Sequence, residues 1–270
     1  SYTQLAAFTC NGLLLGLTRG QVQGRMAPFY KYIALSHREW SYSQRSWNRP
    51  EHTYCWLLRQ SEFCRRHCMD NRMLDTLDRE DFGSPEEPKN AFSHPGGLTS
   101  AVAVGMFFHR HRIRLTEVDR MGAEAVALTH GSPNAFLTGA ALAHIITCIL
   151  RKPEAPLKSV FIHATTAIRE EFGHQYSQAY EVANLMRNAI TYAGSRSLKP
   201  IDVMERLKCT TCAEVLAGAA YACLTCEGDF DRAMIVAVNH SGRSAAVGAV
   251  AGAILGAKLG ESALPEFYME

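Results

Sequence analysis

The 270-residue sequence has almost no charge imbalance, since 28 basic and 26 acidic residues give a formal net charge of +2. So small a charge creates no broad field toward nucleic acid, and we expect no nucleic-acid partner. No repeat of fixed period is visible, and no segment alternates strictly between apolar and polar residues as an exposed strand does. The hydrophobic fraction of 47% nevertheless supplies a sizeable core. These features predict an all-α protein.

The apolar segment at residues 245–257 is too short to span a membrane. The run over residues 245–257 stops at Lys258 after 13 residues, whereas a span needs about 20. Residues 5–17 have the apolarity of a signal-peptide core, but no basic segment precedes them and they contain Asn11, so we expect a helix. No membrane partner is expected. Because residue 1 is Ser1 rather than methionine, we expect a missing upstream segment.

The nine cysteines form an odd set, which argues against a disulfide framework and favours the cytoplasm. Cys209-x-x-Cys212 followed by Cys223-x-x-Cys226 has the spacing of a four-thiolate zinc site. The residues between the two pairs are good helix formers, however, and a helix would separate Cys212 from Cys223 by roughly 16 Å. Two thiolates on one zinc ion lie within about 4 Å of each other. We therefore favour buried structural cysteines over zinc.

Residues 239–257 begin as a polar turn and continue as small and aliphatic side chains. Gly248, Gly252 and Gly256 recur every four residues, so in a helix they form one stripe along which a neighbouring backbone can approach closely. We expect this helix to lie at the centre of the fold, with its polar start forming a mouth.

Helix signals recur along the rest of the chain. Thr116 and Asp119 are candidate caps, Ser132 before Pro133 predicts a helix start, and Asp202 with Glu205 fits a capping box. The glycines and prolines of residues 78–97 predict a long loop, of a kind that is often functional. The basic cluster at residues 109–114 fits a solvated corner better than an anion-binding patch. Helices are expected at residues 3–19, 28–39, 51–60, 116–128, 133–150, 157–171, 177–193, 203–207, 213–226 and 230–238.

Several motifs together resemble the ADP-ribosylglycohydrolase family. They are the segments 1–4 (Ser-Tyr-Thr-Gln), 128–133 (Leu-Thr-His-Gly-Ser-Pro), 227–230 (Glu-Gly-Asp-Phe), 239–242 (Asn-His-Ser-Gly), 247–253 (Val-Gly-Ala-Val-Ala-Gly-Ala) and 264–265 (Leu-Pro). The resemblance implies one domain over residues 1–270, built of orthogonally packed helices and lacking the family's N-terminal helix with its catalytic carboxylate. Active members of the family use two magnesium or manganese ions to cleave the bond between ADP-ribose and an acceptor.

The departures from the family pattern concern the metal site. The four carboxylates that hold the metals in the family fall on Ser1, Tyr2, Arg243 and Ala245. At roughly 4 Å and an effective dielectric constant near 20, Arg243 would repel a dication by about 8 kcal/mol. In the family's substrate loop, an arginine and a proline are replaced within residues 96–103. We therefore expect no catalytic residue, no metal ion and no cofactor.

The resemblance then leaves three hypotheses. The first is a catalytically inactive protein that binds a partner, for example an immunity protein against an ADP-ribosylating toxin, or that binds an ADP-ribose-like ligand. The second is an active or altered hydrolase that removes ADP-ribose from a protein or small acceptor, with His130, His240, Ser241 or Ser244 as the candidate groups, although a structural role for the two histidines is the simpler expectation. The third is a ligand sensor with an anion site at the start of the helix near Arg243, although Arg243 pairing with an internal carboxylate is the simpler expectation there. The candidate ligand-binding residues are Thr3, Gly96, Gly97, Ser100, His130, His240, Ser241, Gly242, Arg243 and Ser244.

Overall fold

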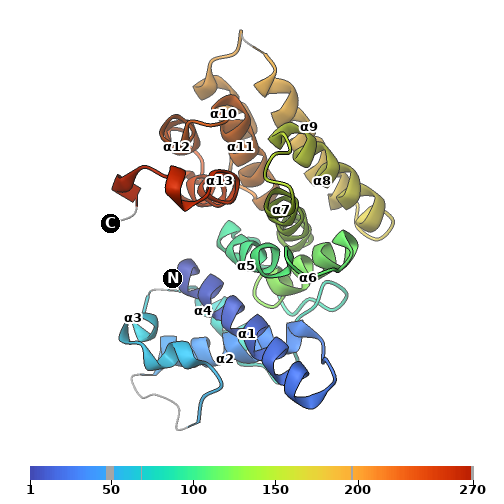
Figure 1. Ribbon diagram of the computed structural model, residues 1–270, viewed down its shortest axis with the longest axis vertical. Helices are drawn as coiled ribbons and strands as arrows, with labels where there is room; N and C mark the ends of the chain where they lie inside the picture. The colour runs from blue at the N-terminus through green and yellow to red at the C-terminus, as the bar shows by residue number, and fades with distance from the viewer. Residues whose placement is uncertain (47–51, 68, 196, 269–270) are drawn as a thin grey trace.

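A computed structural model describes residues 1–46, 52–67, 69–195 and 197–268 (Figure 1). Over these ranges the protein consists of helices, with no strand, which confirms the predicted all-α class. The α-helices are α1 (Tyr2–Gln23), α2 (Phe29–Arg45), α3 (Ser61–Cys64), α4 (Asn71–Leu77), α5 (Leu98–Phe108), α6 (Leu115–Ala127), α7 (Pro133–Arg151), α8 (Leu157–Phe172), α9 (Gln178–Ala193), α10 (Pro200–Leu207), α11 (Cys212–Thr225), α12 (Phe230–Val238) and α13 (Ser244–Leu259). Short 3-10 helices are η1 (Trp56–Arg59), η2 (Pro95–Gly97), η3 (Glu261–Ala263) and η4 (Glu266–Tyr268).

Helix α7 lies at the centre of the fold. It starts at Pro133 after Ser132, as predicted, and contacts α5, α6, α8, α9, α11 and α13. Figure 1 shows α1 to α4 on one side of it and α8 to α12 on the other. By length and composition α7 could cross a membrane, but 78% of its most apolar stretch is buried inside the protein, as in a core helix. The prediction that residues 239–257 form the central helix is therefore wrong.

Helix α13 instead packs on the flank of α7, mainly against α11 and α12. Its buried face is aliphatic, with Val247, Ile254 and Leu255 fully covered, while Ala249 on the opposite side is exposed. The glycine stripe gives close helix contact only at its first position, where an added Cβ would lie 2.9 Å from a methyl of Val238. At Gly256 no atom lies within 4 Å of an added Cβ. The stripe turns away from the core because α12 covers only its beginning.

The cysteine pairs are held apart by a helix, as the residues between them predict. Cys212 opens α11 and directs its sulfur to the carbonyl oxygen of Ser93 at 3.2 Å, whereas Cys223 lies near the end of α11 with its sulfur 3.7 Å from the carbonyl oxygen of Ala251. All four cysteines of the two pairs are buried free thiols. Two sulfurs with such different neighbours do not share one zinc ion.

Several predicted helix ends differ from those in the structure. Helix α1 continues past the predicted end at Arg19 until Gly24, which has the left-handed backbone angle φ of 67°. Asp119 does not cap α6 but lies buried in its second turn. Helix α10 begins with Pro200, so Asp202 and Glu205 form no capping box. The helix predicted over residues 51–60 is reduced to η1 among its described residues, and residue 51 lies outside them.

Two hydrophobic clusters support the fold. The larger one surrounds α7 and takes residues from every helix from α5 to α13. The smaller one joins α1, α2, η1 and α4, around the fully buried indole of Trp40. Buried Gln4 ties α1 to this smaller cluster, because its amide donates to the carbonyl oxygens of residues 62, 63 and 65 and accepts from the Trp40 indole nitrogen. Tyr2, at the start of α1, is thereby brought against η2 at the border between the two clusters.

Candidate functional site

A cavity of about 230 Å³ opens where the starts of α1 and α13 meet η2 and α5. Its walls contain Gly96 and two of the four positions that the sequence resemblance assigns to metal-binding carboxylates, Tyr2 and Ala245. The complete lining is Tyr2, His94, Pro95, Gly96, Leu98, Thr99, Val102, Ala245, Ala246, Ala249 and Val250. We call this space the α13 cavity. The structure thus joins segments that lie more than 240 residues apart in the sequence.

Tyr2 forms one wall of the α13 cavity. Its ring lies directly over Gly96, where an added Cβ would be 2.1 Å from the ring, so only glycine fits beneath it. The ring also stacks on His94, with 5.2 Å between the centroids and 10° between the planes. Burial, reinforced by the nearby charge of Asp70, raises the pKa of Tyr2 to about 12. The position that the resemblance assigns to a carboxylate is therefore occupied by a neutral phenol.

Thr99 fixes the geometry of this wall. Its hydroxyl lies 3.1 Å from the carbonyl oxygen of Tyr2 and 2.9 Å from that of Gly96, and so connects α1 to η2. Its neighbour Ser100 was the predicted ligand-binding residue. Ser100 is fully buried and accepts a hydrogen bond from Thr9, away from the cavity. One residue step rotates a helix by about 100°, so Thr99 and Ser100 face different neighbours.

Gly97 and His130 lie beneath the cavity, in the protein interior. An added Cβ at Gly97 would be 2.4 Å from the His130 ring, so these two residues pack directly on each other. His130 is fully buried, and its Nδ1 lies 2.7 Å from the hydroxyl of Thr129. Burial lowers the pKa of His130 to about 3, which leaves the ring neutral. Neither residue lines the cavity.

The polar start of α13 is internally hydrogen-bonded. The backbone nitrogen of Ser241 donates to Glu205 at 2.8 Å, and its hydroxyl donates to the same carboxylate. The backbone nitrogen of Gly242 donates to Nδ1 of His240 at 3.0 Å, while Nε2 of His240 lies 3.0 Å from the carbonyl oxygen of Ala237. Ser241 and His240 therefore have separate partners and do not form a nucleophile and base pair.

Arg243 precedes α13 and is exposed. Its Nε donates to the carbonyl oxygen of Thr210 at 3.0 Å, rather than to an internal carboxylate. Its positive charge nevertheless reaches the cavity, because it acts to lower the pKa values of both Tyr2 and His94. Ser244 donates its hydroxyl to the carbonyl oxygen of His240 at 3.0 Å and does not line the cavity.

Ser1 and Thr3, on either side of Tyr2, do not line the cavity. The hydroxyl of Ser1 accepts from the backbone nitrogen of Gln4 at 3.3 Å and caps the helix. Thr3 is exposed and lies outside the cavity lining.

The lining of the α13 cavity does not fit a magnesium or manganese ion. Both ions take oxygen ligands, with carboxylates to balance their charge, and none of the lining residues carries a carboxylate. The acid whose charge acts on both Tyr2 and His94 is Asp70, and it is engaged by Arg72 at 2.6 and 3.0 Å. The side-chain oxygens of the lining are those of a neutral phenol and of one threonine hydroxyl that already bonds to carbonyls.

Sequence reasoning missed part of this lining. Ala249 lies one helical turn beyond Ala245, and Val250 one turn beyond Ala246, so helical periodicity applied to position 245 would have identified the α13 wall. His94 had no comparable signal, because it lies in the irregular segment before η2.

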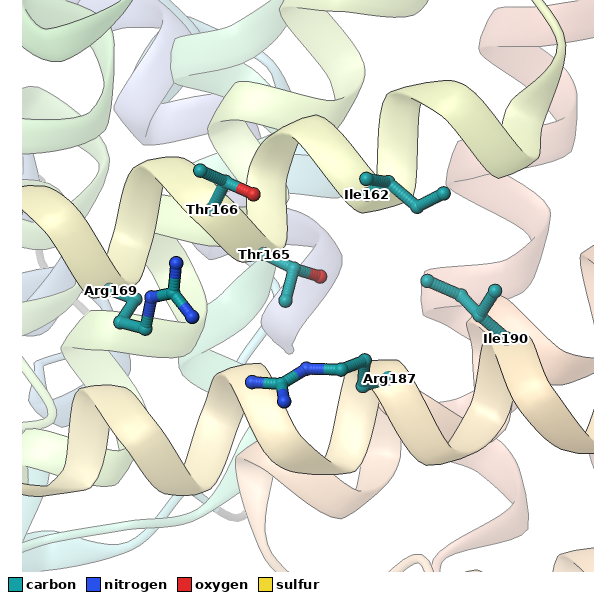
Figure 2. Close-up of a pocket in the computed structure, with 6 residues that line it drawn as sticks. All are labelled: Ile162, Thr165, Thr166, Arg169, Arg187 and Ile190. Atoms are coloured by element: carbon teal, nitrogen blue, oxygen red, sulfur yellow. The ribbon is translucent and has the colours of Figure 1, made fainter.

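A second hollow, of about 120 Å³, lies between α8 and α9 and shares no residue with the α13 cavity. Figure 2 shows the guanidinium groups of Arg169, from α8, and Arg187, from α9, near each other at one end, with Ile162 and Ile190 at the other. Thr165 and Thr166 complete the lining. None of these residues was predicted from the sequence, since two arginines on separate helices form no recognisable pattern.

Comparison with known proteins agrees with the motifs described above. The sequence model of the ADP-ribosylglycohydrolase family matches residues 1–270. No curated protein matches the chain. Because the family match extends over the whole of the sequence, this chain belongs to the ADP-ribosylglycohydrolase family.

Proposed function

We propose that this protein is a member of its family that does not hydrolyse ADP-ribose linkages and acts by binding a protein partner at the α13 cavity. The observation that carries the proposal is the lining of that cavity, in which a tyrosine and an alanine occupy two metal-ligand positions of the family and no carboxylate is present. Without anionic oxygen ligands the cavity has no means of concentrating two divalent cations.

The size and polarity of the α13 cavity favour an apolar or aromatic group from a protein. Ligand pockets for whole small molecules usually measure about 300–1,000 Å³, and 230 Å³ is below that range. Ala245 and Ala249 give one wall without polar side chains, and the stacked rings of Tyr2 and His94 offer a flat surface on another. A protruding side chain of a partner fits such a space better than a nucleotide diphosphate does.

Charge and family analogy suggest the class of partner. Arg243 is exposed beside the cavity and its guanidinium bonds to a single carbonyl oxygen, which leaves it able to meet an acidic group. An ADP-ribosyltransferase, whose activity this family opposes, is the partner class we propose, so that the protein would act as an immunity or inhibitor protein. This assignment rests on analogy at the level of the family.

The absence of hydrolysis is tested directly by incubation with protein substrates that carry ADP-ribosyl-arginine or ADP-ribosyl-serine. The reactions are run with magnesium, with manganese and with a chelator, and we expect no release of ADP-ribose in any of them. Turnover under any of these conditions would overturn the proposal in favour of an altered hydrolase.

Binding is tested with the immobilised full chain and purified ADP-ribosyltransferase domains. The substitution Ala249→Arg should fill the α13 cavity and abolish capture of the transferase. The matched control, Ala263→Arg, adds the same charge at another exposed alanine outside the cavity and should retain capture. The proposed mode of binding would be refuted if no transferase were captured, or if Ala249→Arg still captured the transferase. It would also be refuted if calorimetry showed that the chain binds free ADP-ribose and no transferase.

A further inference from the structure

A cluster of metal-ligating side chains lies where α7 meets α6 and α8. His144 and Cys148 are one turn apart on α7 and therefore share a face, and α8 brings His163 to it. One ligand atom from each of the three residues lies within 4.8 Å of the other two. Within the described ranges this is the only such group of three. We call it the α7–α8 cluster.

A buried carboxylate orients the first histidine of the cluster. Nδ1 of His144 lies 2.9 Å and 3.0 Å from the two carboxylate oxygens of Asp119, and both side chains are almost completely buried. Nδ1 therefore carries a proton that it donates to Asp119, and Nε2 is turned toward His163. A histidine held by a carboxylate through one nitrogen, with the other directed at a ligand position, is the usual arrangement at zinc sites.

The distance between the two histidines of the cluster is close to that of tetrahedral zinc coordination. Nε2 of His144 and Nδ1 of His163 are 2.7 Å apart, whereas two imidazoles on one zinc ion would be separated by about 3.3 Å. His163 is exposed, so a small rotation of its side chain provides the difference. The sulfur of Cys148 is within reach of the same point, and its side chain is half-buried.

We propose that His144 through Nε2, His163 through Nδ1 and Cys148 through its sulfur bind one zinc ion, in a site separate from the α13 cavity. Nitrogen and sulfur ligands select zinc over magnesium or manganese. Binding displaces the thiol proton of Cys148 and the proton shared between Nε2 of His144 and Nδ1 of His163, and the thiolate together with the Asp119 carboxylate balances the charge of the ion. The exposed position of His163 leaves the fourth coordination position open to water.

Cobalt(II) is the probe for this site, because it replaces zinc in tetrahedral sites and absorbs visible light there. The full chain, freed of metal by a chelator, should bind one equivalent of cobalt with visible tetrahedral bands and a sulfur charge-transfer band, and zinc should displace it. Cys148→Ser should remove the charge-transfer band, and His163→Ala should weaken binding at least tenfold. Cys10→Ser, at another half-buried thiol, and His174→Ala, at another exposed histidine, should change neither signal.

The Asp119 contact provides a separate test. Replacing a carboxylate that holds a metal-bound histidine typically lowers metal affinity 10- to 100-fold, so Asp119→Asn should weaken zinc binding within that range. The Cys148 and His163 variants, on a half-buried and an exposed side chain, keep the proposal testable if Asp119→Asn does not fold. Absence of stoichiometric metal binding by the wild type overturns the proposal. So does a cobalt spectrum that persists in Cys148→Ser and disappears when Cys209 and Cys212 are replaced.

Discussion

Two glycine-to-alanine substitutions should change the stability of this protein in opposite directions. Gly12 lies where α1 crosses α2, and an added Cβ there would be 2.6 Å from the Cα of Ile33 and 2.8 Å from the carbonyl oxygen of Tyr32. Gly256 lies on the outer side of α13, where no atom is within 4 Å of an added Cβ. The same chemical change therefore meets a neighbouring backbone in one helix and open space in the other.

The magnitudes follow from contact distances and helix propensity. Carbon atoms normally approach to about 3.5–4.0 Å, so Gly12→Ala requires α1 and α2 to separate by about 1 Å. Overpacking of this kind costs about 1–3 kcal/mol, and contacts with backbone atoms favour the upper end. Alanine has a helix propensity about 1 kcal/mol more favourable than that of glycine, which offsets part of this cost. The net destabilisation of Gly12→Ala is then about 2 kcal/mol. Gly256→Ala gains propensity without a clash and should be stabilised by about 0.5–1 kcal/mol.

Urea unfolding followed by circular dichroism measures both effects. The midpoint should fall for Gly12→Ala and rise for Gly256→Ala, with unchanged dependence of the unfolding free energy on urea. A lower midpoint for Gly256→Ala would contradict the open space beside Gly256, because it would mean that another chain or segment covers this face of α13 in solution. A higher midpoint for Gly12→Ala would refute the close crossing of α1 and α2.

Two further predictions concern buried polar groups. The Arg151 guanidinium donates to four carbonyl oxygens within residues 108–113, at 3.0–3.2 Å. Arg151→Ala should therefore lower the free energy of unfolding by about 1–3 kcal/mol in urea titrations. The control Lys152→Ala, at an exposed side chain, should change it by less than about 0.5 kcal/mol. Burial lowers the pKa values of His37 and His130 to about 3, so the unfolded chain takes up protons first as the pH falls below about 6.5. Stability is then complete above that pH and is lost toward pH 3 by about 1.4 kcal/mol per pH unit for each histidine. Unfolding measured at pH 7.0 and 5.5 should show this loss, and a smaller one in His130→Gln; equal stability at the two values would contradict the burial of neutral rings.

Local signals in the sequence predicted most helices but not their arrangement. Pro133 after Ser132 marks the start of α7 because a proline at the first helical position and a preceding serine act through neighbouring backbone groups alone. The choice of α13 as the central helix failed for a different reason. Alanine and glycine bury little area each, so an apolar helix rich in them can keep one face exposed at low free-energy cost. The bulkier aliphatic side chains around α7 required burial on all sides.

The two candidate sites differ in how far the sequence reveals them. Motif positions identified Tyr2 and Ala245, which the structure brings to one cavity, because family motifs mark where segments converge. The α7–α8 cluster has no such motif. Asp119, His144 and His163 come from three helices, and their meeting depends on how those helices cross. The spacing of residues along a single helix could have predicted only that His144 and Cys148 share a face.

The α13 cavity lies at the border between the two hydrophobic clusters, so the cavity is lost when either cluster unfolds locally. Tyr2 packs with the smaller cluster of α1, α2, η1 and α4, whereas Leu98 and Val250 belong to the larger one around α7. A transient opening of the smaller cluster would remove one wall of the cavity while the larger cluster stayed folded. Any occupant must therefore slow hydrogen–deuterium exchange in α1 and α2, including amides far from the cavity, and leave exchange at the centre of α7 governed by global unfolding.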